Sequence, residues 1–365
     1  MSAISTLSSF LQNITLVQNS QNQIAQLTFQ VDTGLKSQDL AGYGAQANQL
    51  LNLQSAQATE QNYVSNNTQT GTFLTAYDTT LSQLSGDATK LSAALDAFTV
   101  TDPNAISNLQ ALVKGLQTDV AATLNTQVGG RFLYAGTRYT TQPVGDLTAA
   151  SQTLAAPVPN PAGVPPTTAF IPVAAPAVPG YDNQASTINV TPPAVQTPQQ
   201  VADGNQSYAQ QTTVVANNQQ VTYGISSNDA TFQNLVSALQ NALGATQPGI
   251  STATQQQFIQ NAVDQIQVAL NGSPAVPAGG GNPAIPAISG LQGLQDLNGT
   301  AETLVANANT VHNQTLATLQ SQITVIDQVD PATVATELST AQNTLEGSYK
   351  VVSSVLNETL LNYLK

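Results

Sequence analysis

Apolar residues alternate at spacings of three and four between residues 74 and 98, and this is the strongest periodic pattern in the chain. The alternation places its members on one narrow seam of an α-helix and is typical of a coiled coil. The helical pattern extends upstream, and a helix over residues 45–99 would be about 80 Å long at about 1.5 Å per residue. Such a helix cannot bury its own seam, so it requires partner helices. The seam consists of Leu74, Tyr77, Leu81, Leu84, Ala88, Leu91, Leu95 and Phe98.

A second apolar seam begins after a helix boundary at residues 101–103. Asp102 can cap a helix with its side chain, and Pro103 suits the first helical turn. A tight turn between two long seams predicts an antiparallel helical hairpin. The second seam consists of Ile106, Leu109, Val113, Leu116, Val120 and Leu124.

Both ends of the chain carry narrower apolar seams, in which Gln, Asn, Ser and Thr separate the apolar residues. Short polar side chains compete for backbone hydrogen bonds, so each end is a weak helix by itself. We therefore expect the two ends to be helical only when they are packed. The N-terminal seam consists of Ile4, Leu7, Leu11, Ile14, Val17, Ile24, Leu27 and Val31. After a break at residues 327–331, the C-terminal seam consists of Val334, Leu338, Ala341, Leu345, Val352, Val355, Leu360, Leu361, Tyr363 and Leu364.

The composition changes abruptly between the two helical arms. Residues 142–198 hold twelve of the nineteen prolines, a density that excludes a helix and confines strands to sheet edges. We expect irregular chain with a short strand at residues 186–191, and a hairpin that pairs residues 212–216 with residues 220–225. A flexible linker over residues 142–180 is the alternative.

Helical patterns return after this insert. Asn228 and Asp229 can cap a helix that carries Phe232 and Leu235, and a further helix carries Phe258 and later apolar residues. The sequence therefore predicts a mainly α fold with a smaller β-containing insert, built as a terminal coiled coil and a long antiparallel helical bundle. The expected segments are residues 1–40, 41–140, 141–228, 229–328 and 329–365, the first and last being the two halves of the coiled coil.

Charge and composition exclude several classes of function. Only 7% of residues are charged and the net charge is −13, so nucleic acids and anionic membranes are poor partners. There is no cysteine, no run of apolar residues long enough to span a membrane, and no sign of a cleavable signal peptide. A surface of neutral amides and hydroxyls suits a protein that packs densely against copies of itself.

Residues able to support catalysis or to hold a metal or cofactor are almost absent. His312 is the only histidine, and it lies on a heptad helix with no acidic cluster near it in sequence. The acidic residues are scattered, and the many Ser and Thr hydroxyls lack a base that would make one a nucleophile. The loop at residues 272–290 lacks the Lys and Ser/Thr of a phosphate-binding loop. We expect no enzyme activity, no metal and no cofactor.

Two segments carry distinctive motifs: VGGRFLYAGTRYTTQPV at residues 128–144, which we refer to as the hinge motif, and LLNYL at residues 360–364. Both resemble segments of the bacterial flagellin family, and within it of the hook-associated proteins of the hook–filament junction, where the segment similar to the hinge motif closes the helical part. The final LLNYL is similar to their Leu-Leu/Phe-Asp-Tyr-Leu ending, although Asn362 replaces the Asp and Lys365 is added. Filament flagellins more often end in Ser-Leu-Leu-Arg. The residues matching the hinge motif are Gly130, Arg131, Phe132, Tyr134, Ala135, Gly136, Thr141 and Pro143.

The resemblance covers residues 4–143 and 232–364 and implies a structural role in swimming motility. It implies that residues 1–31 and 331–365 pair as the inner coiled coil of a tubular polymer, with the seam residues above as the assembly interface. It also implies export without a cleavable signal, an extracellular location in the flagellum, an export chaperone on the C-terminal helix, and the hook, filament and cap proteins as partners. The alternatives are a filament flagellin, a chemoreceptor-like signalling coil, and a secreted adhesin or phage-tail fibre.

Overall fold

The computed structural model describes residues 2–100, 102–136, 139–140, 142–145, 147–148, 210–227, 229–275, 277 and 287–363. Within these ranges, side chains are described from residue 11 to residue 354. The strand predicted at residues 186–191 and most of the alternative linker at residues 142–180 lie outside the described residues. The chain divides into two compact units, and each contains one end of α2 and one end of α7. The first unit is Met1–Asn62 with Val311–Lys365, and the second unit is Tyr63–Thr310.

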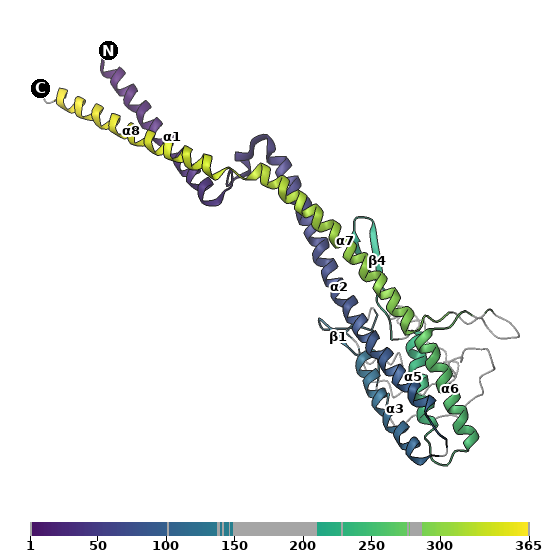
Figure 1. Ribbon diagram of the computed structural model, residues 1–365. Helices are drawn as coiled ribbons and strands as arrows, with labels where there is room; N and C mark the ends of the chain where they lie inside the picture. The colour runs from purple at the N-terminus through teal and green to yellow at the C-terminus, as the bar shows by residue number, and fades with distance from the viewer. Residues whose placement is uncertain are drawn as a thin grey trace, which may run out of the picture. The chain divides into compact units, whose positions relative to one another are not determined.

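Helices dominate the described residues, and the strands form two separate antiparallel ribbons (Figure 1). This confirms the predicted mainly α fold with a smaller β-containing insert. None of the described helices is both long enough and apolar enough to cross a membrane. The elements are α1 (Ser2–Thr33), the 3-10 helix η1 (Leu40–Gln46), α2 (Ala47–Asp96), α3 (Pro103–Leu124), β1 (Gln127–Val128), β2 (Arg131–Phe132), β3 (Gln211–Ala216), β4 (Gln219–Tyr223), α5 (Ala230–Gly244), α6 (Thr252–Asn271), α7 (Gly290–Asp327) and α8 (Pro331–Tyr363).

Side-chain caps fix where three of the helices begin. The Asp102 carboxylate accepts a hydrogen bond of 2.8 Å from the backbone N–H of Asn104 at the start of α3. Asp229 accepts one of 2.8 Å from the N–H of Thr231 at the start of α5. Both caps were predicted from the sequence and are confirmed. Ser251 caps α6 in the same way, a contact that the sequence analysis missed.

The core of the second unit joins α2, α3, α5, α6 and the first turns of α7. The predicted seam of α2 lies in this unit, and every member from Leu74 to Leu95 is buried, while Phe98 is partly buried. Leu74 packs in a neighbouring cluster with the β3–β4 hairpin and α7, and the other members pack in the main core. This burial explains why the seam repeats so strictly, because the other helices of the core enclose it.

The β3–β4 hairpin packs on the long helices of the second unit. Its strands pair in the predicted place, and Asn218 in the turn has a φ of +59°. Val215 and Val221 contact the apolar side chains of α2 and α7, and the Asn67 amide of α2 donates a hydrogen bond of 2.9 Å to the Val215 carbonyl oxygen. The hairpin lies within the predicted outer insert at residues 141–228, yet it adds side chains to the helical core.

The first residues of the same insert are also anchored in the second unit. The side-chain amide of Asn125 both donates to the carbonyl oxygen of Val144 (2.8 Å) and accepts from its N–H (3.0 Å). Val144 and Leu147 are buried in the main core. The chain therefore enters the proline-rich segment from a fixed position.

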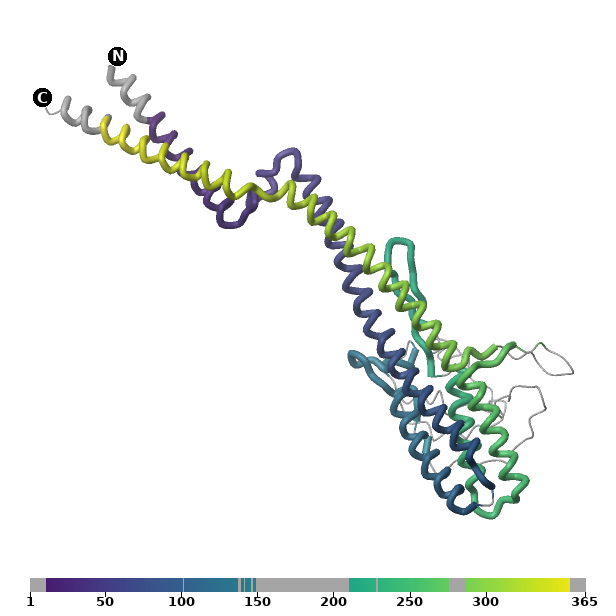
Figure 2. Tube along the Cα trace, in the orientation of Figure 1, coloured from purple at the N-terminus to yellow at the C-terminus, as the bar shows by residue number. Residues whose placement is uncertain are grey.

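The first unit consists of helix pairs that share only small apolar clusters. Helices α1 and α8 lie side by side (Figures 1 and 2), joined by a small cluster around Leu27, Val334 and Ala341. The 3-10 helix η1, the start of α2 and the end of α7 share a second small cluster, which consists of Tyr43, Leu50, Ile323 and Ile326.

Candidate assembly interface

The predicted terminal seams meet in the α1–α8 pair of the first unit, but only part of each seam is buried there. Leu27, Val334 and Ala341 are buried, and Ile24 and Leu338 pack against them. The other seam residues fall into four groups. Val17, Leu345 and Val352 are partly buried, and Leu11, Ile14 and Val31 are exposed. Ile4, Leu7, Val355, Leu360, Leu361 and Tyr363 lie in the helices but have no described side chains, and Leu364 is outside the described residues.

Most of the exposed large apolar side chains of the described chain belong to the first unit. Val325 on α7 is 81% exposed, which is the largest value among them. An apolar surface spread along helices of this kind is typical of a protein–protein interface. The exposed set in this unit is Leu11, Ile14, Leu16, Val31, Leu40, Leu51, Val311, Val325, Tyr349 and Val351.

A backbone joint connects the two chain ends where α1 stops and α8 begins. The N–H of Lys36 donates to the carbonyl oxygen of Asp327 (2.7 Å), and the N–H of Val329 donates to that of Gly34 (3.0 Å). Leu35 and Gln328 form an antiparallel bridge between these bonds. Residues about 290 positions apart in sequence are thereby held as a short two-stranded ribbon.

Side chains reinforce the joint. The Tyr43 hydroxyl hydrogen-bonds the Asp327 carboxylate. The hydroxyl oxygen of Tyr43 also lies 2.9 Å from the carbonyl oxygen of Ser37. Burial of the phenol and, second, the bond to Asp327 raise the pKa of Tyr43. At the start of α8, Asp330 accepts hydrogen bonds from the Thr333 hydroxyl (2.6 Å) and the Ala332 N–H, and these lower the pKa of its carboxyl.

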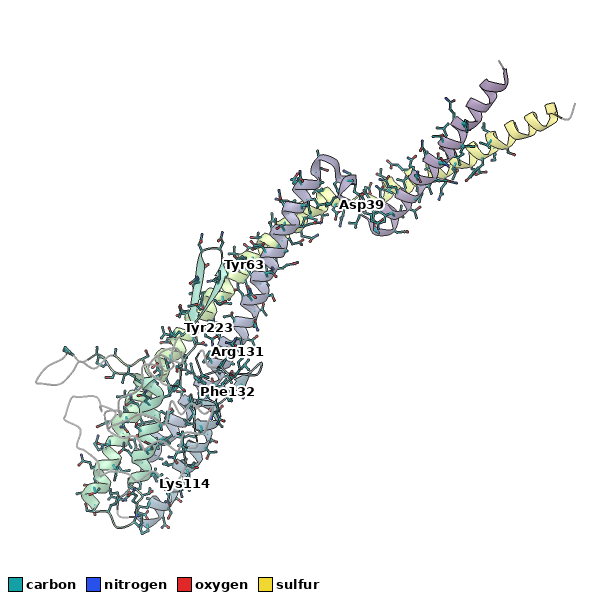
Figure 3. All side chains as sticks on the ribbon, turned by 180° about the vertical axis from the view of Figure 1, so that it is seen from behind. Asp39, Tyr63, Lys114, Arg131, Phe132 and Tyr223 are labelled. Carbon is teal, nitrogen blue, oxygen red and sulfur yellow. The ribbon has the colours of Figure 1, made fainter. Side chains whose placement is uncertain are left out.

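The hinge motif is a packing centre in the second unit. Gly129 and Gly130 have positive φ angles of 58° and 78° and make the tight turn between β1 and β2. The Arg131 guanidinium lies 5.2 Å from the ring centroid of Phe73 and 4.4 Å from that of Tyr139, and it donates to the Gln211 amide oxygen (3.2 Å). Figure 3 shows Arg131, Phe132 and Tyr223 together beside α2. The arginine therefore ties the β1–β2 ribbon to α2 and to β3.

Two other residues of the motif complete this centre. The Tyr134 ring is fully buried edge-on to Tyr77, at 5.2 Å, and to Phe232, at 5.3 Å, and its hydroxyl pairs with that of Thr80 (2.7 Å). Gly136 has a φ of +59°, and its carbonyl oxygen accepts from the Gln211 side chain (3.2 Å). Tyr134 thus lies inside the helical core.

The single histidine has an acidic partner that the sequence analysis failed to identify. His312 on α7 is only 5% exposed, and its Nδ1 atom pairs with the Glu60 carboxylate of α2 within the first unit. The two residues are 252 positions apart in sequence, so the pair forms only through the fold, and the sequence around His312 contains no acidic cluster, as expected. The described residues contain no group of three His, Cys, Asp or Glu side chains that could hold a metal ion.

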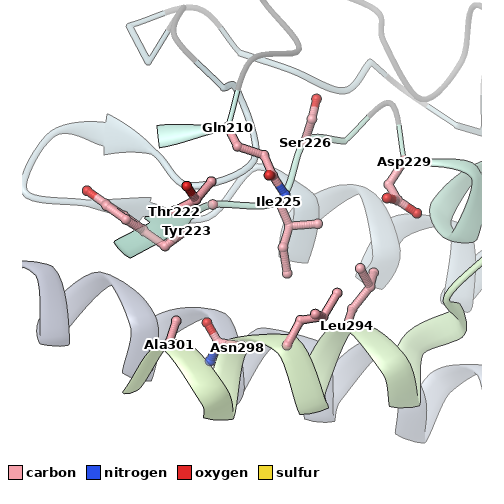
Figure 4. Close-up of a pocket in the computed structure, with 11 residues that line it drawn as sticks. Gln210, Thr222, Tyr223, Ile225, Ser226, Asp229, Leu294, Asn298 and Ala301 are labelled. Atoms are coloured by element: carbon pink, nitrogen blue, oxygen red, sulfur yellow. The ribbon is translucent and has the colours of Figure 1, made fainter. Parts of the chain in front are cut away.

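A groove of about 480 Å³ lies between α7 and the chain that follows β4 in the second unit (Figure 4). Leu294, Leu297 and Ala301 of α7 form its floor, and Asn298 is held there by a hydrogen bond from its side-chain N–H to the Leu74 carbonyl oxygen (2.9 Å). We refer to it as the α7 groove. The remaining lining residues are Gln210, Thr222, Tyr223, Gly224, Ile225, Ser226 and Asp229.

Comparisons with known proteins find similarity among solved structures. No known protein family and no curated protein matches the sequence. Among solved structures, the chain is similar to a protein of Vibrio parahaemolyticus described as a candidate flagellar hook-associated protein, at 10% identity and a TM-score of 0.45. The match covers 77% of this chain and 96% of that chain. At this identity and TM-score, the similarity assigns no function.

Proposed function

We propose that this chain is a structural subunit of the bacterial flagellum, and that it assembles through its terminal helices and performs no chemistry. The proposal rests on the distribution of buried and exposed apolar side chains in the first unit. Its α1–α8 pair buries a short seam, while Leu11, Ile14, Tyr349 and Val351 on the same two helices stay exposed. Two helices with this distribution have apolar surface left for further helices.

The energetics of these helices favour assembly over an independent fold. Burying one Leu or Val side chain stabilises a fold by about 1.5–3 kcal/mol, and α1 and α8 bury very few such side chains. Ordering each residue of the two long helices costs about 1–2 kcal/mol of backbone entropy, which the short seam offsets only in part. Contacts with neighbouring subunits would supply the missing burial.

The residues of the hinge motif and the tail support the flagellar assignment. Both resemble the corresponding segments of the junction proteins, and the tail with Tyr363 near its end favours the hook–filament junction. A filament flagellin is the alternative. The proposal includes the hook, filament and cap proteins as partners, an export chaperone that binds α8, an extracellular location, and a role in swimming motility.

Electron microscopy of the purified protein under polymerising salt tests this function. Weak polymerisation with binding to the distal end of isolated hooks is the expected result for a junction subunit. Long tubes would identify a filament flagellin instead. Trimers or fibres without a central channel would remove the chain from the flagellum and favour an adhesin or fibre protein.

A truncation tests the role of the terminal helices directly. Removing residues 357–365 should abolish both tube formation and hook binding, while the circular dichroism of the second unit's helices is retained. Normal assembly by the truncated chain would contradict the proposal. Alanine replacement of the exposed Lys114 on α3 is a suitable control, because it leaves both terminal helices intact.

A further inference from the structure

Arg131 in the hinge motif is held in a fixed place by the residues around it. Its guanidinium lies 5.2 Å from the ring centroid of Phe73 and 4.4 Å from that of Tyr139, and it donates to the Gln211 amide oxygen (3.2 Å). The same amide oxygen accepts a hydrogen bond of 3.1 Å from the Tyr223 hydroxyl, which fixes it in turn. The guanidinium is therefore oriented by its own chain before any partner reaches it (Figure 3).

The positive charge of Arg131 has no carboxylate partner in the part of the chain that the structure describes. The ion pairs found there are Lys90–Asp87, His312–Glu60 and Lys350–Glu346. The Arg131 side chain is partly buried, so water solvates its charge less completely than it solvates the exposed ammonium of Lys114. Charges removed from water are stabilised when they are paired, so this guanidinium lacks the group that would complete its surroundings.

Most hydrogen-bond donors of this guanidinium are unused within the described residues. A guanidinium carries several N–H donors in one plane, and the Gln211 amide oxygen accepts from one of them. The two aromatic rings attract the charge but do not replace a carboxylate, which accepts two parallel N–H bonds from the planar fork. The unused donors of Arg131 therefore suit a carboxylate.

A second copy of the chain is the partner that the composition favours. Each copy carries 20 acidic residues and 7 Lys and Arg residues, with a net charge of −13. Copies of this kind repel one another where they pack, unless basic groups meet carboxylates across the contact. Within the described ranges Arg131 is the one arginine, the residue type best suited to pair with a carboxylate at an interface.

We propose that the Arg131 guanidinium binds the carboxylate of an Asp or Glu side chain from a second copy of this chain. The inference rests on the self-assembly proposed above, and it adds a contact of the second unit to the interface of the terminal helices. Two N–H groups of the guanidinium donate to the two carboxylate oxygens, while Phe73, Tyr139 and Gln211 keep the guanidinium in position. Each such contact neutralises one positive and one negative charge, so it lowers the repulsion between acidic copies.

A zero-length cross-link tests the contact and identifies the carboxylate. Arg131→Lys keeps the positive charge and supplies a primary amine, which a carbodiimide joins to a carboxylate in direct contact. Unlabelled Arg131→Lys chains are assembled as a minority with isotope-labelled wild-type chains, coupled and digested, and the peptides containing position 131 are analysed by mass spectrometry. The expected product joins unlabelled position 131 to a labelled Asp or Glu peptide, and it should be absent before assembly. Lys114 of the same unlabelled chains is the matched control, because it is exposed and has no part in the proposed contact.

The possible outcomes separate this contact from the proposed function. Assembled protein in which position 131 couples to labelled chains no more than Lys114 does would overturn the contact alone. Coupling of position 131 within its own chain would overturn it too, because the chain would then neutralise Arg131 by itself. Coupling to a hook protein would overturn the second copy as the partner. A wild-type chain that never polymerises and never binds hooks would overturn the proposed function, and this contact with it.

Two substitutions distinguish binding by Arg131 from its packing role. Arg131→Gln removes the charge and should raise the concentration needed for polymerisation by about tenfold. Phe73→Leu removes one aromatic contact of the guanidinium and leaves the charge, so it should weaken the anchoring of the β1–β2 ribbon but change that concentration little. Thermal unfolding of the isolated proteins measures the loss of packing in both. Equal effects of the two substitutions on polymerisation would show a purely structural arginine and would contradict the proposed contact.

Discussion

Two neutral tyrosines at the centre of the second unit make its stability depend on pH. Tyr77 and Tyr134 are almost completely buried, and their hydroxyls hydrogen-bond the Leu133 carbonyl oxygen and the Thr80 hydroxyl. Burial raises the pKa of both phenols well above their ordinary value of 10.0. The fold therefore favours the protonated phenols.

This burial predicts a loss of stability at alkaline pH. Below pH 10.0 both the folded and the unfolded chain keep these protons, so the full stability is present. Above pH 10.0 the unfolded chain loses the phenol protons before the folded chain does. The free energy of unfolding should therefore fall by about 1.4 kcal/mol per pH unit for each tyrosine. Urea denaturation of the wild type and Tyr134→Phe between pH 9 and 11.5 measures the difference. The Phe variant should show the shallower slope, the half-exposed Tyr349→Phe should match the wild type, and equal slopes for all three would contradict the assignment.

Two helical glycines in the second unit differ in the space around them, which predicts opposite effects of alanine. A Cβ atom at Gly244 would lie 2.8 Å from ring atoms of Phe258, which is itself buried, whereas one at Gly115 would meet nothing within 4 Å. Gly115→Ala should raise the free energy of unfolding by about 1 kcal/mol. Gly244→Ala should lower it, since overpacking costs about 1–3 kcal/mol. Chemical denaturation measures both, and stabilisation by Gly244→Ala would show that α5 and α6 can move apart.

At the scale of the elements, the backbone joint between residues 34–36 and 327–329 couples the folding of α1 to the folding of α8. Gly34 ends α1 with a φ of +72°, and its carbonyl oxygen accepts the hydrogen bond from Val329 just before α8. A side chain at that φ is strained, so the joint depends on glycine here.

Gly34→Ala should therefore disorder both terminal helices together. The strain of alanine at this φ is about 1–2 kcal/mol, which is comparable with the stabilisation that apolar burial in the short α1–α8 seam provides. Amide exchange in α1 and α8 should therefore accelerate by about tenfold. Gly347→Ala, on α8 with open space around it, is the control and should slow exchange slightly. Faster exchange in α1 alone would show that the helices order independently and that the joint does not couple them.

Sequence periodicity was sufficient to locate the helices but not their contacts. The seam from Leu74 to Phe98 and the caps at Asp102 and Asp229 were predictable because each depends on residues within one or two turns. The Glu60–His312 pair, the Gly34–Val329 joint and the placement of the β3–β4 hairpin depend on residues far apart in sequence, which no local pattern reports.

The candidate site was predictable to the same limited extent. The terminal seams were visible as periodic apolar residues, and the α1–α8 pair brings together Leu27, Val334 and Ala341 from opposite ends of the chain. The α7 groove was not predictable, because its floor comes from a seam helix and its walls come from the chain after β4. Likewise, the hinge motif was recognised from its residue types, but its Arg131 contact with two aromatic rings required the fold.

At the scale of the whole molecule, the two units use their apolar residues differently. The second unit encloses a core shared by several helices and fixes it with buried tyrosines and a hairpin. The first unit has two small clusters and a larger exposed apolar set. Stability should therefore be divided unequally between them, because burial of apolar surface is the main favourable term in folding.

Hydrogen exchange on the isolated and the assembled protein tests this division. In the isolated chain, amides of α1 and α8 should exchange at least about a hundredfold faster than those of α3 and α5, which corresponds to about 3 kcal/mol less local stability. On assembly, protection should rise in α1 and α8 and stay constant in α3, which serves as the internal control. Uniform slow exchange in the isolated chain would mean that the terminal pair is stable without partners, and the exposed apolar side chains would then need another explanation than assembly.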